Sequence, residues 1–156
     1  MIHTVNPFSG ANEIYAEVVL GLGEVLAGND PGRALSFSFP KSDGQPRLLA
    51  YPSKSFGLYG GGLIFRSDSS GEDLPEYAAA GLYDSVMMIP PQKVLLDYTE
   101  EPLVWDENFQ KEFLTGIAQI GLLVEGVLES PQDIEGAWAR GQYYVVQTRP
   151  QVGIDG

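Results

Sequence analysis

Two strand-like runs near the C-terminal end, residues 130–136 and 143–150, constrain the fold of this chain most strongly. The short segment between them contains the step Arg140-Gly141, which is typical of a turn. The two runs are therefore predicted to pair as an antiparallel β-hairpin. Nineteen glycines and eleven prolines in 156 residues indicate many further turns, and so a fold of short strands and loops.

Four polar side chains are predicted to lie together on one face of this hairpin. Side chains two residues apart share a face of a strand, so Asp133 and Glu135 point the same way. The same rule places Gln147 and Arg149 together on the partner strand. Carboxylate and amide oxygens are the ligands that Mg²⁺ prefers, and an arginine fork suits a phosphate. The pattern is that of a possible metal and nucleotide site.

The same cluster has a simpler explanation as the solvated face of a terminal hairpin. Cross-strand polar pairs of this kind contribute only about 0.2–1 kcal/mol. Ala137 and Val145 are predicted to continue the face, which would confine the polar cluster to one end of the hairpin, as on the floor of a cleft.

Composition excludes several classes of function. The formal net charge of −12, with no basic stripe, argues against nucleic acid as a partner. The chain has no cysteine, so it holds neither a disulfide framework nor a zinc-thiolate site. Its one histidine, His3, excludes a multi-histidine metal centre and is predicted to be structural, with no obvious partner. No run of 18 apolar residues occurs, so no membrane span is expected.

Apolar periodicity predicts one long helix among short strands. Asp106 is placed to cap a helix that runs from Glu107 to about residue 127. Apolar side chains recur along it every three or four residues, at Phe109, Phe113, Ile117, Ile120 and Val124. Gly116 and Gly121 weaken this helix by about 1 kcal/mol each relative to alanine, so tertiary packing must hold it. Strands are predicted over residues 1–5, 13–20, 33–39, 48–51, 63–66 and 94–98, with a helix as the competing prediction for residues 13–20.

Two loops are candidates for ligand binding. The glycine-rich bend over residues 21–28 could cradle a phosphate on its backbone amides, although a plain tight turn is the commoner use of such a bend. Residues 67–75 gather serines and acids beside a predicted strand end, which fits a functional loop or a solvated, serine-capped turn.

The hairpin also resembles a known motif. Residues 132–136 and 145–150 are similar to the closing motif of the nucleotide-binding domain of the dikinases, the family of pyruvate, phosphate dikinase and phosphoenolpyruvate synthase. Within that family the chain most resembles, from end to end, the C-terminal end of the α-glucan, water dikinases. The other similar stretches are residues 2–4, 6–7, 13–19, 21–24, 31–33, 51–54, 65–69, 71–74, 80–86 and 96–99.

This resemblance implies an ATP-grasp-like α+β fold, a mostly antiparallel sheet with one long packed helix, in which ATP and Mg²⁺ lie between two lobes. It implies that Asp133, Glu135 and Gln147 hold Mg²⁺ and the phosphates. Arg149, together with Gln147, would stabilise the transferring phosphoryl group, the main catalytic device of this chemistry.

Two further residues carry implied roles. Glu17 matches the acid expected near the ribose hydroxyls, and Arg66 resembles a phosphate-contacting arginine of related synthases. In those synthases the arginine motif precedes the equivalent of the strand at residues 13–19, so the assignment of Arg66 depends on a changed order of segments.

The family transfers the β-phosphate of ATP through a phosphohistidine to α-glucan and the γ-phosphate to water. Residues 1–156 are expected to be the C-terminal part of the nucleotide-binding domain, without the upstream lobe and the phosphohistidine domain, and inactive toward glucan alone. The family implies a plastid in a plant or alga, and the cytoplasm otherwise. Two rival functions stay open: a non-catalytic nucleotide-binding remnant, and a glucan-binding or structural module in which Trp105 and Trp138 stack on sugars. Burial of both tryptophans would argue against the second.

Overall fold

The structure is a computed structural model that describes residues 1–27, 30–61, 64–66, 73–74, 77–78 and 85–153. Contacts divide the chain into two units. Unit 1 comprises Met1–Val18, Gly32–Ser53 and Asp97–Gly156, and unit 2 comprises Val19–Pro31 and Lys54–Leu96. The unit 1 elements are β1 (Ile2–His3), β2 (Glu13–Val18), β3 (Leu35–Pro40), β4 (Arg47–Ala50), the 3₁₀ helix η1 (Tyr98–Glu100), α2 (Pro102–Trp105), α3 (Glu107–Leu128), β11 (Gln132–Ala139) and β12 (Gln142–Pro150).

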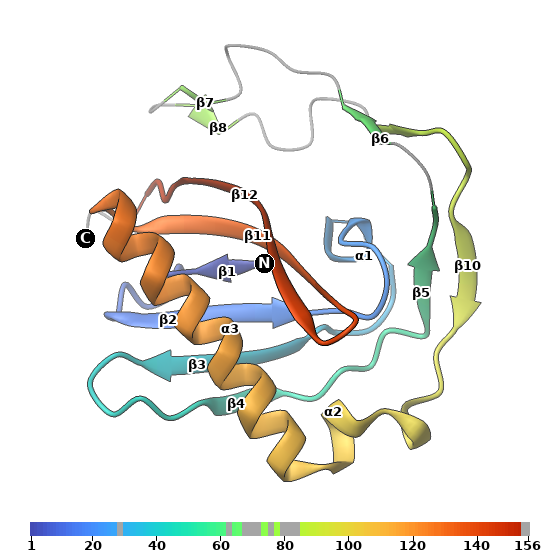
Figure 1. The fold of residues 1–156 in the computed structure, drawn as a ribbon, viewed down its shortest axis with the longest axis horizontal. Coiled ribbons are helices and arrows are strands. Elements are labelled where there is room, and N and C mark those ends of the chain that lie inside the picture. The colour runs from blue at the N-terminus through green and yellow to red at the C-terminus, as the bar shows by residue number, and fades with distance from the viewer. Residues whose placement is uncertain (28–29, 62–63, 67–72, 75–76, 79–84, 154–156) are drawn as a thin grey trace. The chain divides into compact units, whose positions relative to one another are not determined.

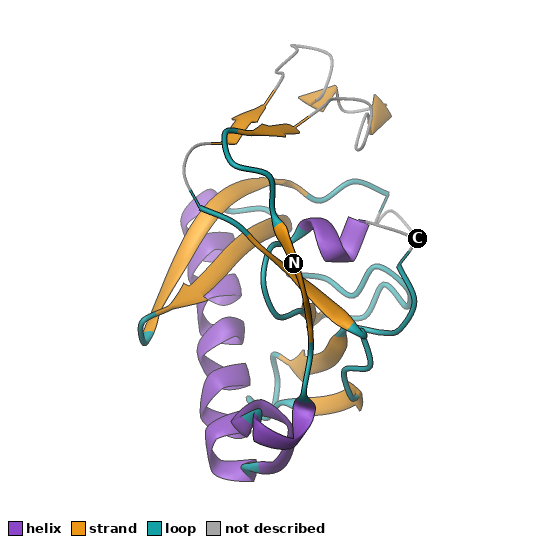
Figure 2. Ribbon diagram, turned by 90° about the vertical axis from the view of Figure 1, so that its right-hand side faces the viewer, coloured by secondary structure: helices purple, strands orange, loops and turns teal. Residues whose placement is uncertain are grey.

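Unit 1 is a six-stranded sheet with α3 lying across one face (Figures 1 and 2). The strand order is β12-β11-β1-β2-β3-β4, and every neighbouring pair is antiparallel. The strand β1 therefore joins the C-terminal hairpin to the β2–β3–β4 part of the sheet. The predicted α+β class, with a mostly antiparallel sheet and one long helix, is confirmed.

The core of unit 1 lies between the sheet and α3. Along β2, Ile14 and Ala16 are fully buried, and the β3 side chains Leu35 and Phe37 beside them are buried as well. Alternate residues of β2, beginning with Glu13, point to the other face. This alternation decides residues 13–18 in favour of a strand, although their composition also suits a helix.

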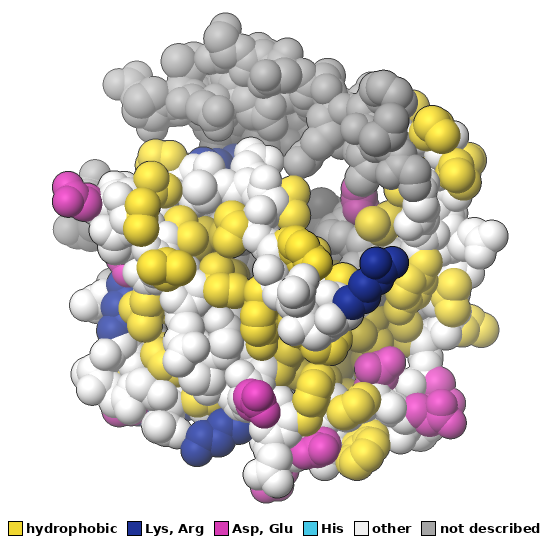
Figure 3. Space-filling view, viewed as in Figure 1, with side chains coloured by type: hydrophobic (Ala, Val, Ile, Leu, Met, Phe, Trp, Pro, Cys, Tyr) yellow, Lys and Arg dark blue, Asp and Glu magenta, His cyan; other side chains and the backbone are white. Residues whose placement is uncertain are grey.

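The long helix matches its prediction closely. The Asp106 carboxylate caps it by accepting from the amides of Asn108 and Phe109 at 3.1 and 3.0 Å. Phe113 and Ile117 of the predicted stripe are buried, and the rest of the stripe packs against the core. Apolar side chains also reach the surface of unit 1, among them Leu123, Val127, Val145 and Val146. Figure 3 shows hydrophobic side chains at the surface in the view of Figure 1.

The two helix glycines that weaken α3 lie where a side chain would collide. A Cβ at Gly121 would come within 3.0 Å of Ile14 Cδ1 and 3.3 Å of Ile2 Cγ2. At Gly116 it would meet the Tyr143 ring, whose hydroxyl donates to the Phe113 carbonyl at 3.1 Å. The glycines let α3 approach the sheet and the hairpin closely, and this packing offsets their poor helix propensity.

Unit 2 contains α1 (Glu24–Ala27), β5 (Phe56–Tyr59), β6 (Ile64–Arg66), β7 (Asp73–Leu74), β8 (Tyr77–Ala78), β9 (Ser85–Met87) and β10 (Gln92–Leu95). Its strands form antiparallel pairs, β5 with β10, β6 with β9 and β7 with β8. The strand β5 has no counterpart in the sequence prediction, because its four residues lie among turn-forming ones. The strand predicted over residues 94–98 is wrong at its end, since Asp97 caps η1 by accepting from Thr99 N at 3.0 Å. None of the described helices is long and apolar enough to cross a membrane.

Replacing Gly121 by leucine should destabilise unit 1 by about 1–3 kcal/mol, because the added atoms overpack the contact with Ile14 and Ile2. Gly126 is the matched control, since a Cβ there meets nothing within 4 Å. Gly126→Leu should stabilise by up to about 1 kcal/mol through helix propensity. Denaturant unfolding measures both, and equal effects would contradict the close approach of α3.

Candidate functional site

The C-terminal hairpin forms as predicted and sets the register of the candidate site. β11 and β12 are joined by Arg140 and Gly141, both with positive φ (53° and 76°), as in a type I′ turn. Asp133 pairs with Arg149, and Glu135 pairs with Gln147. The two carboxylates, the amide and the guanidinium thus lie in adjacent rows on one face.

A bulge in β12 changes the hairpin beyond this cluster. The register shifts after Glu135, so Gly136 pairs with Val145 and Val146 has no partner. An extra residue in one strand reverses the alternation of faces beyond it. Val145 therefore shares the face of Gly136, and the prediction that it continues the face of Glu135 is wrong.

Five of the six predicted site residues lie on the same face of the sheet, opposite α3. The register of the strands carries the face from the hairpin through β1 to β2. One row runs from Asp133 through His3 to Tyr15. Two residues along each strand, backbone hydrogen bonds join Met1 to Glu17 in the next row of this face. The residues on this face are Glu17, Asp133, Glu135, Gln147 and Arg149, and we refer to them with His3 and Tyr15 as the polar face.

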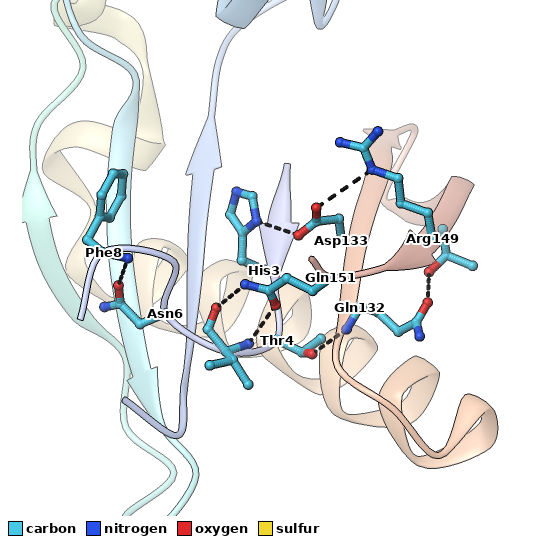
Figure 4. Close-up of polar contacts among 10 residues, drawn as sticks. His3, Thr4, Asn6, Phe8, Gln132, Asp133, Arg149 and Gln151 are labelled. Atoms are coloured by element: carbon cyan, nitrogen blue, oxygen red, sulfur yellow. Dashed lines mark hydrogen bonds and ion pairs between the residues drawn. The ribbon is translucent and has the colours of Figure 1, made fainter. Parts of the chain in front are cut away.

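Asp133 contacts two other residues of the polar face (Figure 4). Its Oδ1 lies 2.6 Å from His3 Nδ1, and its Oδ2 lies 3.7 Å from Arg149 Nε. The Asp133 side chain is 12% exposed, so both contacts are partly shielded from water. His3 therefore does have a partner, although none is obvious from the sequence. Its partner lies 130 residues away, and no local pattern shows this pairing.

Glu17 is oriented by the neighbouring strand residue on the same face. The Tyr15 hydroxyl donates to Glu17 Oε1 at 3.1 Å, and Phe8 packs edge-on against the Tyr15 ring. Burial of the phenol, and then the charge of Glu17, raise the pKa of Tyr15. Burial lowers the pKa of the Met1 amino group, while Glu135 and Glu17 both raise it. The charges of Glu135 and Glu17 thus both act on the Met1 amino group.

Buried amides fix the start of β11 and so present Asp133. The backbone N–H of Gln132 donates to Thr4 Oγ1 at 2.8 Å, and the side-chain Oε1 of Gln132 accepts from Thr148 Oγ1 at 2.9 Å. Gln151 binds both backbone groups of Val5 through its own side chain. Figure 4 shows these contacts beside Asp133. The sequence analysis did not single out these residues, because a glutamine carries no sign of being buried.

The other predicted ligand-binding elements lie in unit 2. Arg66 ends β6 opposite Ser85, while its side chain and residues 67–72 lie outside the described part. At Gly21, with φ 85°, a Cβ would collide with the Leu58 carbonyl oxygen, which accepts from Leu22 N at 2.7 Å. A close approach of backbones thus explains this glycine, as in the tight-turn alternative, without a phosphate.

The oxygen donors of the polar face suit a hard cation that also binds water and phosphate oxygens. Within the described residues, no three or more of the side chains of His, Asp and Glu are grouped so that they could hold a metal ion. Two carboxylates and one amide are oxygen donors of the kind that Mg²⁺ takes, and Mg²⁺ usually keeps waters and phosphate oxygens as its remaining ligands. The residues present therefore fit Mg²⁺ bound together with a phosphate.

Neither tryptophan is buried, so burial gives no argument against a sugar-stacking role. Trp105 is 61% exposed and Trp138 is 43% exposed. The Trp138 ring is also held edge-on by Phe109 and Phe113 of α3, with centroids 6.1 and 5.4 Å apart. This contact gives Trp138 a packing role in unit 1.

Comparison with known proteins identifies the relatives of the chain. It is 56% identical over 155 residues to α-glucan water dikinase, chloroplastic, of Solanum tuberosum and to that of Citrus reticulata. It is 50% identical over 155 residues to α-glucan water dikinase 2 of Arabidopsis thaliana. The chain is a relative of one segment of the α-glucan water dikinases. The matches cover 97% of the chain but only 10–12% of the length of these relatives, and no known protein-family profile matches it.

Replacing Gln132 by methionine should cost about 1–3 kcal/mol of unfolding free energy, because Thr148 and Ser130 lose a buried partner. Gln142→Met, at an exposed position of the same hairpin, should change the stability by less than about 0.5 kcal/mol. Thermal or urea unfolding tests the pair. Equal losses would show that the Gln132 contacts do not anchor β11.

The raised pKa of Tyr15 predicts alkaline destabilisation. Folding favours the neutral phenol, so this stability is present below the unfolded pKa of about 10 and is lost as pH rises through the folded pKa. Above pH 10, Tyr15→Phe should therefore lose less stability with rising pH than the parent chain does. Unfolding measured from pH 8 to 11 would contradict this if the two curves stayed parallel.

Proposed function

We propose that the polar face binds ATP with Mg²⁺, as the C-terminal part of an ATP-grasp-like nucleotide-binding domain in a dikinase. The supporting observation is the placement of Asp133, Glu135, Gln147 and Arg149 in adjacent register rows on one face. The relatives, which are named as α-glucan water dikinases, support the same reaction class. In this proposal residues 1–156 hold part of the nucleotide site, and other segments supply the opposing lobe.

The first rows of the hairpin would hold the cation. Asp133 and Glu135 supply carboxylate oxygens, and Gln147 supplies its amide oxygen. When bound, Mg²⁺ would supply positive charge that neutralises the phosphates. The chain must bring these acids together despite their mutual repulsion, and Arg149 beside Asp133 offsets part of it.

Arg149 and Gln147 contribute to the chemical step. The Arg149 side chain is 31% exposed, so its guanidinium remains accessible while Asp133 orients it. A fixed cation beside the phosphates stabilises the charge that develops during phosphoryl transfer without reorganising. Gln147 would orient a phosphate oxygen or cation from the next row.

Glu17 binds the ribose hydroxyls at the other end of the nucleotide. It lies on β2, two strands away from β11, which corresponds to about 10 Å across a sheet. A nucleoside triphosphate can extend over such a distance along the polar face. Arg66, from unit 2, is proposed as a further phosphate contact.

The proposed dikinase transfers the β-phosphate of ATP through a phosphohistidine to α-glucan and the γ-phosphate to water. The single histidine of the chain is held by Asp133, so we expect no transfer to glucan by these 156 residues alone. Glucan would be reached through other segments of the enzyme. The chloroplastic names of relatives favour a plastid location in a plant or alga.

Calorimetric titration with ATP and MgCl₂ tests the binding face. Arg149→Met and Glu135→Gln should each weaken binding about 10–100-fold, because each removes a charge-assisted contact to phosphate or cation. Arg140→Met in the hairpin turn and Glu112→Gln on the exposed side of α3 make the same changes elsewhere and should leave the affinity within about twofold.

If Arg149→Met and Glu135→Gln both bind ATP as the parent chain does, the hairpin is not part of the ATP site. Binding to soluble maltooligosaccharides with no binding of ATP, lost in Trp105→Ala, would favour the glucan-binding alternative instead.

A further inference from the structure

His3 forms a hydrogen bond with one carboxylate oxygen of Asp133, which is a proposed metal ligand. Its Nδ1 lies 2.6 Å from Asp133 Oδ1, with the two side chains 20% and 12% exposed. An ionised carboxylate only accepts hydrogen bonds, so Nδ1 carries the hydrogen and donates it. Such charge-assisted bonds are short and strong, and this one engages one of the two lone pairs of Oδ1.

The imidazole is fixed from both sides. His3 lies on β1, an interior strand of the sheet, between Asp133 on β11 and Tyr15 on β2. Its ring lies 6.0 Å from the Tyr15 ring, centroid to centroid. The donor therefore approaches Asp133 from a fixed direction along the sheet (Figure 4).

The second oxygen of Asp133 points to the side where the phosphates would bind. Oδ2 lies 3.7 Å from Arg149 Nε, beyond normal hydrogen-bond distance, and faces the residue proposed to contact phosphate. With one lone pair of Oδ1 engaged by His3, Oδ2 is the stronger oxygen donor that Asp133 can offer a cation. Bidentate binding would have to use the remaining lone pair of Oδ1, whose donor strength the hydrogen bond with His3 lowers.

We propose that His3 is a positioning residue that keeps Asp133 monodentate and thereby favours Mg²⁺ over Ca²⁺. This inference rests on the proposed function, because it takes Asp133 as a ligand of the ATP-bound cation. Mg²⁺ demands six ligands in near-ideal octahedral geometry, whereas Ca²⁺ accepts six to eight and often takes both oxygens of a carboxylate. A carboxylate limited to one oxygen suits the smaller ion.

The test compares cation affinities of His3 variants in the proposed full-length dikinase saturated with a non-hydrolysable ATP analogue. His3→Asn keeps an N–H close to the position of Nδ1, whereas His3→Leu removes the donor. Binding of Mn²⁺ is followed by water-proton relaxation, and Mg²⁺ and Ca²⁺ are added as competitors. The Mg²⁺-to-Ca²⁺ affinity ratio should fall roughly tenfold in His3→Leu. Loss of an outer partner typically lowers metal affinity by about 10–100-fold, and the proposal expects this loss for Mg²⁺ and not for Ca²⁺. The ratio should stay within about twofold of the parent in His3→Asn.

The outcomes separate the two proposals. If the parent protein binds no cation with the analogue, the proposed function fails. If the parent binds Mg²⁺ and the ratio is unchanged in His3→Leu, or falls equally in His3→Asn, the role of His3 is overturned while the metal site stands. Thermal melting controls for folding. If the His3→Leu protein does not fold, His3→Gln replaces it, because the glutamine amide reaches the position of Nε2 rather than that of Nδ1. His3→Gln should lower the Mg²⁺-to-Ca²⁺ affinity ratio as His3→Leu does.

Discussion

The two-sided pairing of β1 is the constraint on which the rest of unit 1 depends. This strand has only two residues, yet it pairs with β11 on one side and with β2 on the other. Without it the C-terminal hairpin would have no register relative to β2, and Glu17 would have no fixed position relative to Asp133. The buried contacts of Thr4 with Gln132 hold the same junction from its end. Residues from both ends of the chain thus form one surface.

The sheet separates two tasks between its faces. Apolar side chains from alternate positions pack against α3, and glycines on that helix allow it to approach closely. The opposite face gathers acids, an amide, an arginine and the histidine. A cluster of acids is destabilising unless charges or hydrogen bonds compensate it. Here His3 and Arg149 both contact Asp133, and Tyr15 donates to Glu17. The packing against α3 therefore stabilises the sheet, and the sheet in turn holds the charged residues of the polar face in place.

Local signals in the sequence predict the elements well and their long-range contacts poorly. The hairpin and α3 follow from a turn, a cap and an apolar period, all of which act within a few residues. The bulge at Val146 cannot be predicted from such signals, because a single extra residue leaves the local sequence pattern of the strand unchanged. Nor does the bond between His3 and Asp133, since it depends on which strands pair across the chain. The roles of Glu17 and Arg149 come from resemblance to the dikinases, and the register adds only that these two residues share a face.

The most direct test of the central claim is to locate the cation by paramagnetic broadening in NMR spectra of the isotope-labelled chain. With Mn²⁺ and an ATP analogue, resonances of Asp133, Glu135 and Gln147, together with those of neighbouring residues on β1 and β12, should broaden first. Resonances on the exposed side of α3, such as those of Lys111 and Glu112, should broaden least, because α3 lies on the opposite face of the sheet and so farther from the ion. Broadening centred on α3, or the same broadening in Glu135→Gln, would contradict a cation site on the polar face.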